Sequence, residues 1–141
     1  MRGLDDVLAG TRAPGVYRTR RGRASRAPDV TRYGWRTYVI DGRRVGSKLE
    51  LLDTCQVTFD FPEWFGRNWD ALADSLRDLS WAAVEAGRLV RWTAAGRFAT
   101  SDPPAFQTAL DVFREACTFW AHTRTPMVVL VESNDPGLPV L

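Results

Sequence analysis

The spacing of apolar residues predicts three strands between residues 35 and 132. Trp35–Ile40 is rich in β-branched and aromatic residues and predicts a strand, which Asp41-Gly42 ends in a turn. Leu89–Thr93 predicts a second short strand, and Pro126–Glu132 predicts the last one. The last strand carries an unbroken apolar run, which is typical of a strand buried on both faces in a parallel sheet covered by helices.

Capping residues mark the starts of three helices between these strands. Ser47 begins the first helix and forms a capping box with the glutamate three residues later. Asn68 begins the second, because its side-chain oxygen can accept a hydrogen bond from a backbone N–H of the first turn. Ser101 or Asp102 begins the third, with Pro103 at the first helical position, where a missing N–H costs nothing. The order strand–helix–helix–strand–helix–strand predicts a small α/β layer.

The two ends of the chain differ from this body. Residues 1–34 hold eight arginines and three aspartates, a net charge of +5, and the whole chain is +2, so residues 35–141 carry −3. Leu4–Leu8 has the length of one or two helical turns, Pro14–Tyr17 predicts the start of an extended segment, and Arg20–Asp29 is almost without apolar residues. We therefore expect a basic, partly mobile extension over residues 1–34, a domain over 35–133 and a loose, turn-rich tail over 134–141. We also expect the fold to survive removal of residues 1–30.

Composition and length favour one globular domain. The chain has 141 residues, 45% hydrophobic and 26% charged, which excludes a disordered protein. Its longest strongly apolar run, Met127–Val131, is far too short for a membrane span, and the first six residues do not resemble a signal peptide. We therefore expect a cytoplasmic protein. Cys55 and Cys117 lie on apolar helix stripes and we expect free thiols, although the sequence leaves a disulfide open.

The stretch from residue 61 to residue 76 combines acids with large aromatic rings. A helix that begins at Asn68 places Asp70 and Asp74 four residues apart on one face. Leu72 and Leu76 lie on a neighbouring face that suits burial. An acidic face beside aromatic side chains suits binding to a basic partner.

Three short segments together indicate a known family. They are Ile40-Asp41-Gly42, the stretch 62–72 and the helix segment 112–116. Over residues 37–132 the chain resembles the barstar family, intracellular inhibitors of the ribonuclease barnase, in an actinobacterial-type form with an N-terminal extension. The resemblance implies an α/β fold with a three-stranded parallel sheet packed with helices. It also implies an inhibitor that plugs a ribonuclease active site, not an enzyme, and without a cofactor or metal.

The resemblance also implies which residues bind the partner. By position, Asp70 and Asp74 correspond to the family's two central inhibitory aspartates, and Glu115 corresponds to an acidic contact on the last helix. Trp64 takes the place of a contact tyrosine. The partner-binding set implied in this way is Trp64, Gly66, Asn68, Trp69, Asp70, Ala73, Asp74 and Glu115.

Some positions in this region depart from the family pattern. Gly66 and Asn68 match residues of the family's binding loop, but Arg67 between them stands where the family has an acid. Ala73 stands where the family has a contact tryptophan, and the sequence leaves open whether Trp81 replaces another. These departures leave the target ribonuclease open.

Two other classes of function compete with inhibition. Two aspartates and a glutamate could bind Mg²⁺ in an enzyme, but the sequence has no glycine-rich phosphate loop and no Ser/His/Asp or Cys/His arrangement. The Arg-rich N-terminal arm could instead bind nucleic acid, although the acidic body would repel phosphate. Taken singly, each acid fits an ordinary solvated helix face. We expect a one-to-one complex with a barnase-like ribonuclease or a toxin's ribonuclease domain, and no membrane, nucleic-acid or small-molecule partner.

Overall fold

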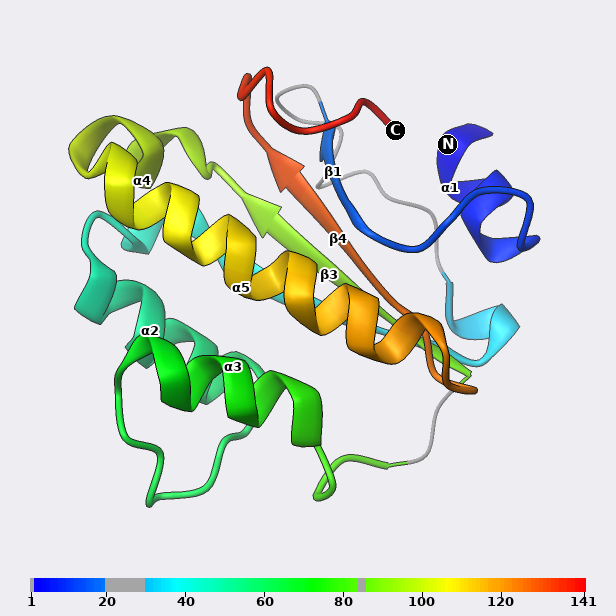
Figure 1. The fold of residues 1–141 in the computed structure, drawn as a ribbon, viewed down its shortest axis with the longest axis horizontal. Helices are drawn as coiled ribbons and strands as arrows, with labels where there is room; N and C mark the ends of the chain where they lie inside the picture. The colour runs from blue at the N-terminus through cyan, green and yellow to red at the C-terminus, as the bar shows by residue number, and fades with distance from the viewer. Residues whose placement is uncertain (1, 20–29, 84–85) are drawn as a thin grey trace.

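The computed structural model describes residues 2–19, 30–83 and 86–141, and its centre is a four-stranded, all-parallel sheet (Figure 1). The strands are β1 (Val16–Thr19), β2 (Trp35–Asp41), β3 (Gly87–Thr93) and β4 (Met127–Glu132), and they lie in the order β1-β4-β3-β2. The three strands expected from the sequence are all present. The expectation of a three-stranded sheet is wrong, because the N-terminal extension supplies a fourth strand.

The added strand explains the unbroken apolar run in β4. Val16 of β1 pairs with Val129, and Thr19 pairs with Glu132, so β4 has a neighbour on each side. All five residues from Met127 to Val131 are buried. A strand paired on both edges and covered on both faces takes apolar residues at every position, as the sequence pattern indicated.

Four helices pack on one face of the sheet, and the opposite face is covered in part. The main face carries α2 (Lys48–Thr58), α3 (Trp69–Asp78), α4 (Gly96–Ser101) and α5 (Pro103–Ala121). The other face carries α1 (Arg2–Leu8) near the start of the strands, and two short 3₁₀ helices, η2 (Thr31–Tyr33) and η3 (Gly42–Arg44), flank β2. Alternate β4 residues accordingly belong to different clusters: Val129 and Val131 to the main core, Val128 and Leu130 to the second.

The expected caps are observed in three helices. The Ser47 hydroxyl accepts a hydrogen bond from the backbone N–H of Glu50 at 3.2 Å, and Asn68 Oδ1 accepts one from Ala71 at 2.7 Å. Asp102, and not Ser101, caps α5. Helix α4 was not predicted, and its N-cap residue makes no side-chain hydrogen bond.

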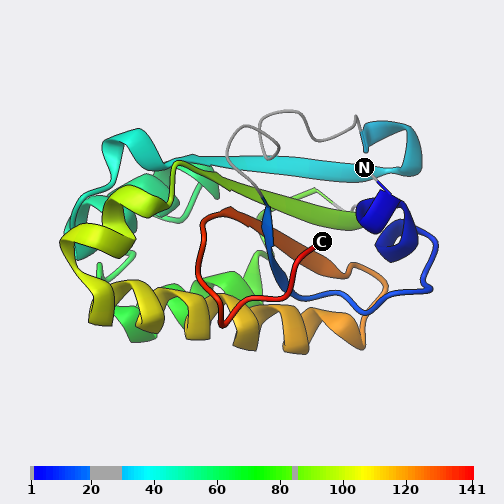
Figure 2. The same cartoon turned by 90° about the horizontal axis from the view of Figure 1, so that it is seen from above.

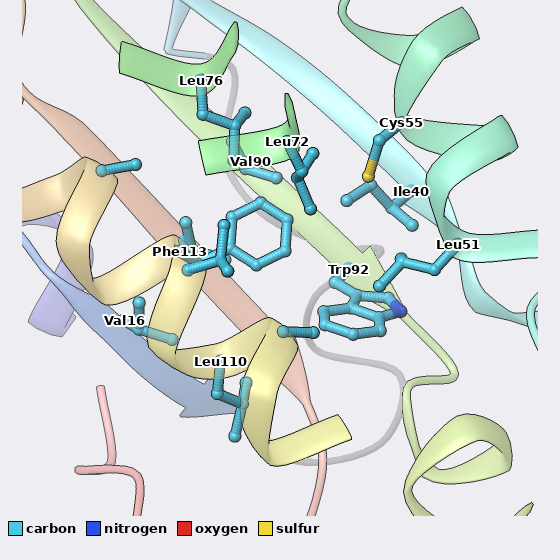
Figure 3. Packing of buried hydrophobic residues seen from close by; sticks show 14 of the residues in the cluster. Val16, Ile40, Leu51, Cys55, Leu72, Leu76, Val90, Trp92, Leu110 and Phe113 are labelled. Carbon is cyan, nitrogen blue, oxygen red and sulfur yellow. The ribbon is translucent and has the colours of Figure 1, made fainter. Parts of the chain in front are cut away.

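The main core is built around the indole ring of Trp92 (Figure 3). The rings of Phe106 and Phe113 lie 5.4 and 5.9 Å from it, measured between centroids. Cys55 and Cys117 are buried in the same core as free thiols. Burial raises the pKa of both thiols, that of Cys117 to about 12, so both stay protonated at neutral pH.

The N-terminal extension is part of the packed structure. Leu4 and Val7 of α1 and Tyr17 of β1 are buried in the second cluster, against residues of β2, β3 and β4. This packing argues against the expectation that residues 1–30 are dispensable. The expected mobility of Arg20–Asp29 concerns residues outside those that the structure describes.

The C-terminal residues are held along β1 rather than loose, as Figures 1 and 2 show. The backbone N–H of Arg18 donates to the carbonyl of Pro139 at 2.8 Å, and Leu141 N–H donates to the carbonyl of Arg18 at 3.2 Å. Leu138 is buried in the main core. The segment therefore covers the outer edge of a very short strand, which protects that edge from pairing with other chains.

Candidate partner-binding surface

Two buried aromatic rings anchor the loop between α2 and α3. Phe61 and Phe65 point into the core with ring centroids 4.9 Å apart, and Phe65 N–H donates to the carbonyl of Pro62 at 2.9 Å. Trp64 lies between these anchors in sequence, yet its side chain is 74% exposed. A large exposed aromatic residue on an anchored loop is well suited to be a contact in a protein interface.

Gly66, Arg67 and Asn68 fix the turn from the loop into α3. Asn68 Nδ2 donates to the carbonyl of Gly66 at 3.2 Å while its Oδ1 caps the helix. Arg67 has a φ of 50°, in the left-handed region that costs an L-residue about 1–2 kcal/mol. Its guanidinium makes a two-point ion pair with Asp53 of α2, at 2.7 and 3.0 Å. The contact ties the loop to α2, and residue spacing alone could not have revealed it.

The two aspartates of α3 are both exposed, but they have different surroundings. Asp74 Oδ1 accepts a hydrogen bond from Arg77 Nη2 at 2.8 Å, and Arg77 Nε also donates to the carbonyl of Ala73 at 3.2 Å. Asp70 makes no side-chain hydrogen bond or ion pair with any residue that the structure describes. Asp70 therefore presents an uncompensated charge, whereas Asp74 is already paired within its own helix. The three-residue spacing of Asp74 and Arg77 on one helix is the signal that could have predicted their ion pair from the sequence.

The remaining aromatic residues near α3 support the surface more than they form it. Trp69 is half-buried against the core, with Lys48 Nζ 5.4 Å from its ring centroid, and Ala73 is half-buried beside it. Trp81 donates from Nε1 to the carbonyl of Phe59 at 3.0 Å and packs edge-on against a loop anchor. These internal contacts favour a structural role for Trp81.

Glu115 lies on the neighbouring helix α5. It is exposed and makes no ion pair with the described residues. Trp120 Nε1 of α5 donates to the carbonyl of Leu76 in α3 at 2.7 Å, which holds the two helices together. The structure thus places the three carboxylates on two adjacent helices, without direct contact between Glu115 and either aspartate.

The metal-site and nucleic-acid hypotheses concern acidic clusters and the arginines of the N-terminal extension. Within residues 2–19, 30–83 and 86–141, no group of three His, Cys, Asp or Glu residues is arranged to hold a metal ion. Two described arginines of the extension are used inside the fold: Arg12 lies 4.6 Å from the Tyr17 ring centroid, and Arg18 Nε donates to the carbonyl of Leu138 at 3.0 Å. No helix in the same ranges has the length and apolarity that crossing a membrane requires.

Comparison with protein families gives one match over most of the chain. The family model described as Barstar (barnase inhibitor) matches residues 35–132. The chain belongs to the barstar family. Barstar-family proteins are inhibitors and not enzymes. No individual curated protein matches the chain.

The family match covers the sheet from β2 to β4 with helices α2 to α5. Helix α1 and strand β1 lie outside it, so the fourth strand is supplied by the part of this chain that precedes the barstar region. The loop, α3 and α5, which carry the candidate residues, all lie inside it.

Proposed function

We propose that the protein inhibits a ribonuclease by inserting an acidic face into the enzyme's cationic active-site cleft. The acidic face comprises Asp70, Asp74 and Glu115. The observation that supports this best is the uncompensated carboxylate of Asp70 on an α3 helix held by its Asn68 cap, in a chain of the barstar family. A ribonuclease cleft binds a polyanion and is lined with cations, so fixed carboxylates can take the places of substrate phosphates.

The partner-binding residues divide into contacts and supports. Trp64 is the exposed aromatic anchor beside the acidic face. Gly66 and Asn68 shape the turn that leads into α3. Trp69 and Ala73 are half-buried residues of α3 that support the surface from below. The proposed partner is a barnase-like ribonuclease or the ribonuclease domain of a toxin, bound one-to-one in the cytoplasm of the cell that the inhibitor protects.

The decisive experiment is co-expression with candidate ribonucleases, purification of the complex and calorimetry of variants. Asp70→Ala and Asp74→Ala should each weaken binding by about 2–5 kcal/mol, a range to which the barnase–barstar pair itself contributes, because each strands a buried cation on the enzyme. Asp5→Ala is the matched control. It removes an exposed acid from α1, on the opposite face of the sheet. Unchanged affinity in both α3 variants would show that the enzyme binds elsewhere.

A further inference from the structure

A cavity lies at the edge of the sheet where β2, β3 and β4 end. It has a volume of about 480 Å³ and is lined by residues at or after the ends of these strands, among them Arg43, Ala94, Arg97, Glu132, Ser133 and Asn134. None of them belongs to the partner-binding set. In open parallel α/β sheets, the carboxyl ends of the strands are where small ligands bind.

A second cavity of about 510 Å³ adjoins the first and shares Gly96, Ser133 and Asn134 with it. Pro103 and Pro136 expose their rings to it, whereas Phe106, which also lines it, is 2% exposed and belongs to the main core. Both volumes fall in the range of small-molecule sites. The two cavities lie side by side; we call the first, which two arginines line, the polar compartment, and the second, which the two proline rings line, the apolar compartment.

Polar side chains also line the apolar compartment. Gln107 Nε2 donates to Asp135 Oδ2 at 2.5 Å, and Asp135 Oδ1 accepts from the backbone N–H of Gly137 at 2.7 Å. An amide and a carboxylate held together in this way are groups that can bind the polar edge of a ring that enters the compartment.

Two arginines and one glutamate line the polar compartment. Arg97 donates from Nη1 to the carbonyl of Arg43 and makes no ion pair within the described residues. Arg43 pairs through Nε and Nη2 with Asp41, at 3.0 and 2.8 Å, which leaves its Nη1 for another acceptor. The hydrogen bonds from Arg43 lower the pKa of Asp41 to about 2, so this pair persists at neutral pH. Glu132 Oε1 accepts from the backbone N–H of Ala94 at 3.1 Å.

The backbone segments around the polar compartment are tightly packed against one another. Ala94 has a φ of 49°, in the left-handed region, and such strained positions concentrate at binding sites. A β-carbon on Gly42 would lie 2.1 Å from the carbonyl oxygen of Thr93, so η3 lies directly against the end of β3. The arginine-bearing walls are therefore fixed before any ligand arrives.

We propose that this edge of the sheet binds a nucleoside monophosphate, with its phosphate at Arg97 and Arg43 and its base in the apolar compartment. Guanidinium groups match phosphate oxygens in charge and geometry. A flat base would cover the exposed rings of Pro103 and Pro136, and its polar edge would reach Gln107. The site shares no residue with the acidic face, so this proposal can be tested independently of ribonuclease inhibition.

The test is a titration of the full chain followed by amide NMR and calorimetry. The probes are guanosine 5′-monophosphate, inorganic phosphate and guanosine, at matched ionic strength. The nucleotide should give saturable shifts in residues 42–44, 94–97 and 133–137, and should bind about tenfold or more tightly than phosphate or guanosine alone. Arg97→Gln should weaken nucleotide binding about tenfold or more.

The control variant is Arg124→Gln. It removes the same charge from an exposed residue that precedes β4, at the opposite edge of the sheet. Equal weakening by both variants would mean that only bulk charge attracts the nucleotide, and would overturn the proposal. Phosphate binding as tightly as the nucleotide, the absence of saturable shifts, or shifts centred on α3 would overturn it too. The amide shifts of the wild-type protein locate the binding site even if a variant fails to fold.

Discussion

Arg77 donates to the carboxylate of Asp74 at 2.8 Å, and the two side chains are 41% and 76% exposed. An exposed pair of this kind contributes less than about 1 kcal/mol to stability. Its larger consequence is for binding, because a partner's cation must displace Arg77 before it can reach Asp74. Asp70, one turn earlier in α3, makes no such pair with a described residue, so a partner's cation can reach it without displacing an arginine.

Replacing Arg77 by glutamine should therefore speed association with the ribonuclease by a few-fold, since it exposes Asp74 and adds to charge steering. Stopped-flow mixing at low salt measures the rate. Arg114→Gln is the control, because Arg114 makes the same three-residue pair with Asp111 on α5, at 2.9 Å. Equal acceleration by both variants would mean that net charge alone, and not the release of Asp74, sets the rate.

The buried thiols make stability fall at alkaline pH. In the unfolded chain Cys55 and Cys117 ionise near pH 9, whereas burial raises the pKa of both in the folded protein. Above pH 9 the folded state holds more protons than the unfolded state, so the free energy of unfolding decreases as pH rises, by up to about 1.4 kcal/mol per pH unit for each thiol. Below pH 9 the thiols contribute no pH dependence.

Urea unfolding under reducing conditions, from about pH 8 to about pH 10.5, measures this slope. The double variant Cys55→Ala/Cys117→Ala should be less stable throughout but should show a shallower decline. An identical slope in the two proteins would assign the decline to other groups, such as the tyrosines and lysines that both share.

At the scale of elements, the sequence predicted what local signals determine. Caps at Ser47, Asn68 and Asp102 predicted three helices, and short runs of β-branched, aromatic and other apolar residues predicted β2, β3 and β4. The sequence indicated an extended segment beginning at Pro14–Tyr17 but not its pairing in the sheet, because β1 has only four residues and its partner lies more than a hundred residues away. Helix α4 was missed because it has only 6 residues and its N-cap residue makes no side-chain hydrogen bond.

The residues of the candidate site divide in the same way, into those that local signals predict and those that depend on contacts between elements. Position within the barstar pattern pointed to the loop and α3, and the structure shows which of those residues are exposed. The contact between Arg67 and Asp53 joins two elements and could not be read from spacing. The half-burial of Trp69 depends on how α2 packs on α3, which no local pattern encodes.

Removing residues 1–30 should lower the melting temperature strongly. The deletion takes away β1 and uncovers the second cluster, where Leu4, Val7 and Tyr17 each bury a side chain that contributes about 1.5–3 kcal/mol. Calorimetry of the full and shortened chains checks this. A melting temperature unchanged within error would mean that β2 to β4 form a stable sheet alone.

A point variant separates packing from chain length. Leu4→Ala should destabilise the protein by about 2–5 kcal/mol, because Leu4 is fully buried. Asp6→Ala, on the exposed side of the same helix, should change stability by less than about 0.5 kcal/mol.

For the whole molecule, the uneven charge distribution governs how the inhibitor should meet its enzyme. Residues 35–141 carry −3 although the full chain carries +2. Inhibition should be competitive with a short RNA substrate, because carboxylates and phosphates seek the same cations. Association should slow as salt rises, since screening shortens the reach of the charges.

Steady-state kinetics across a salt series, with and without a chelator, tests this mechanism. The chelator should have no effect, because the positive charge comes from the enzyme's own side chains. Loss of inhibition with chelator would indicate a bridging metal ion, and noncompetitive inhibition that ignores salt would place the acidic face outside the cleft.

The pairing of β1 with β4 also sets a time order on the ribosome. Val16 pairs with Val129, 113 residues later in the chain. At about 5–20 residues per second, translation needs about 6–23 s to cover that distance. During this interval the first strand has been made but has no neighbour, and its apolar side chains stay uncovered. A newly made chain can complete its sheet only after Met127–Glu132 has left the ribosome.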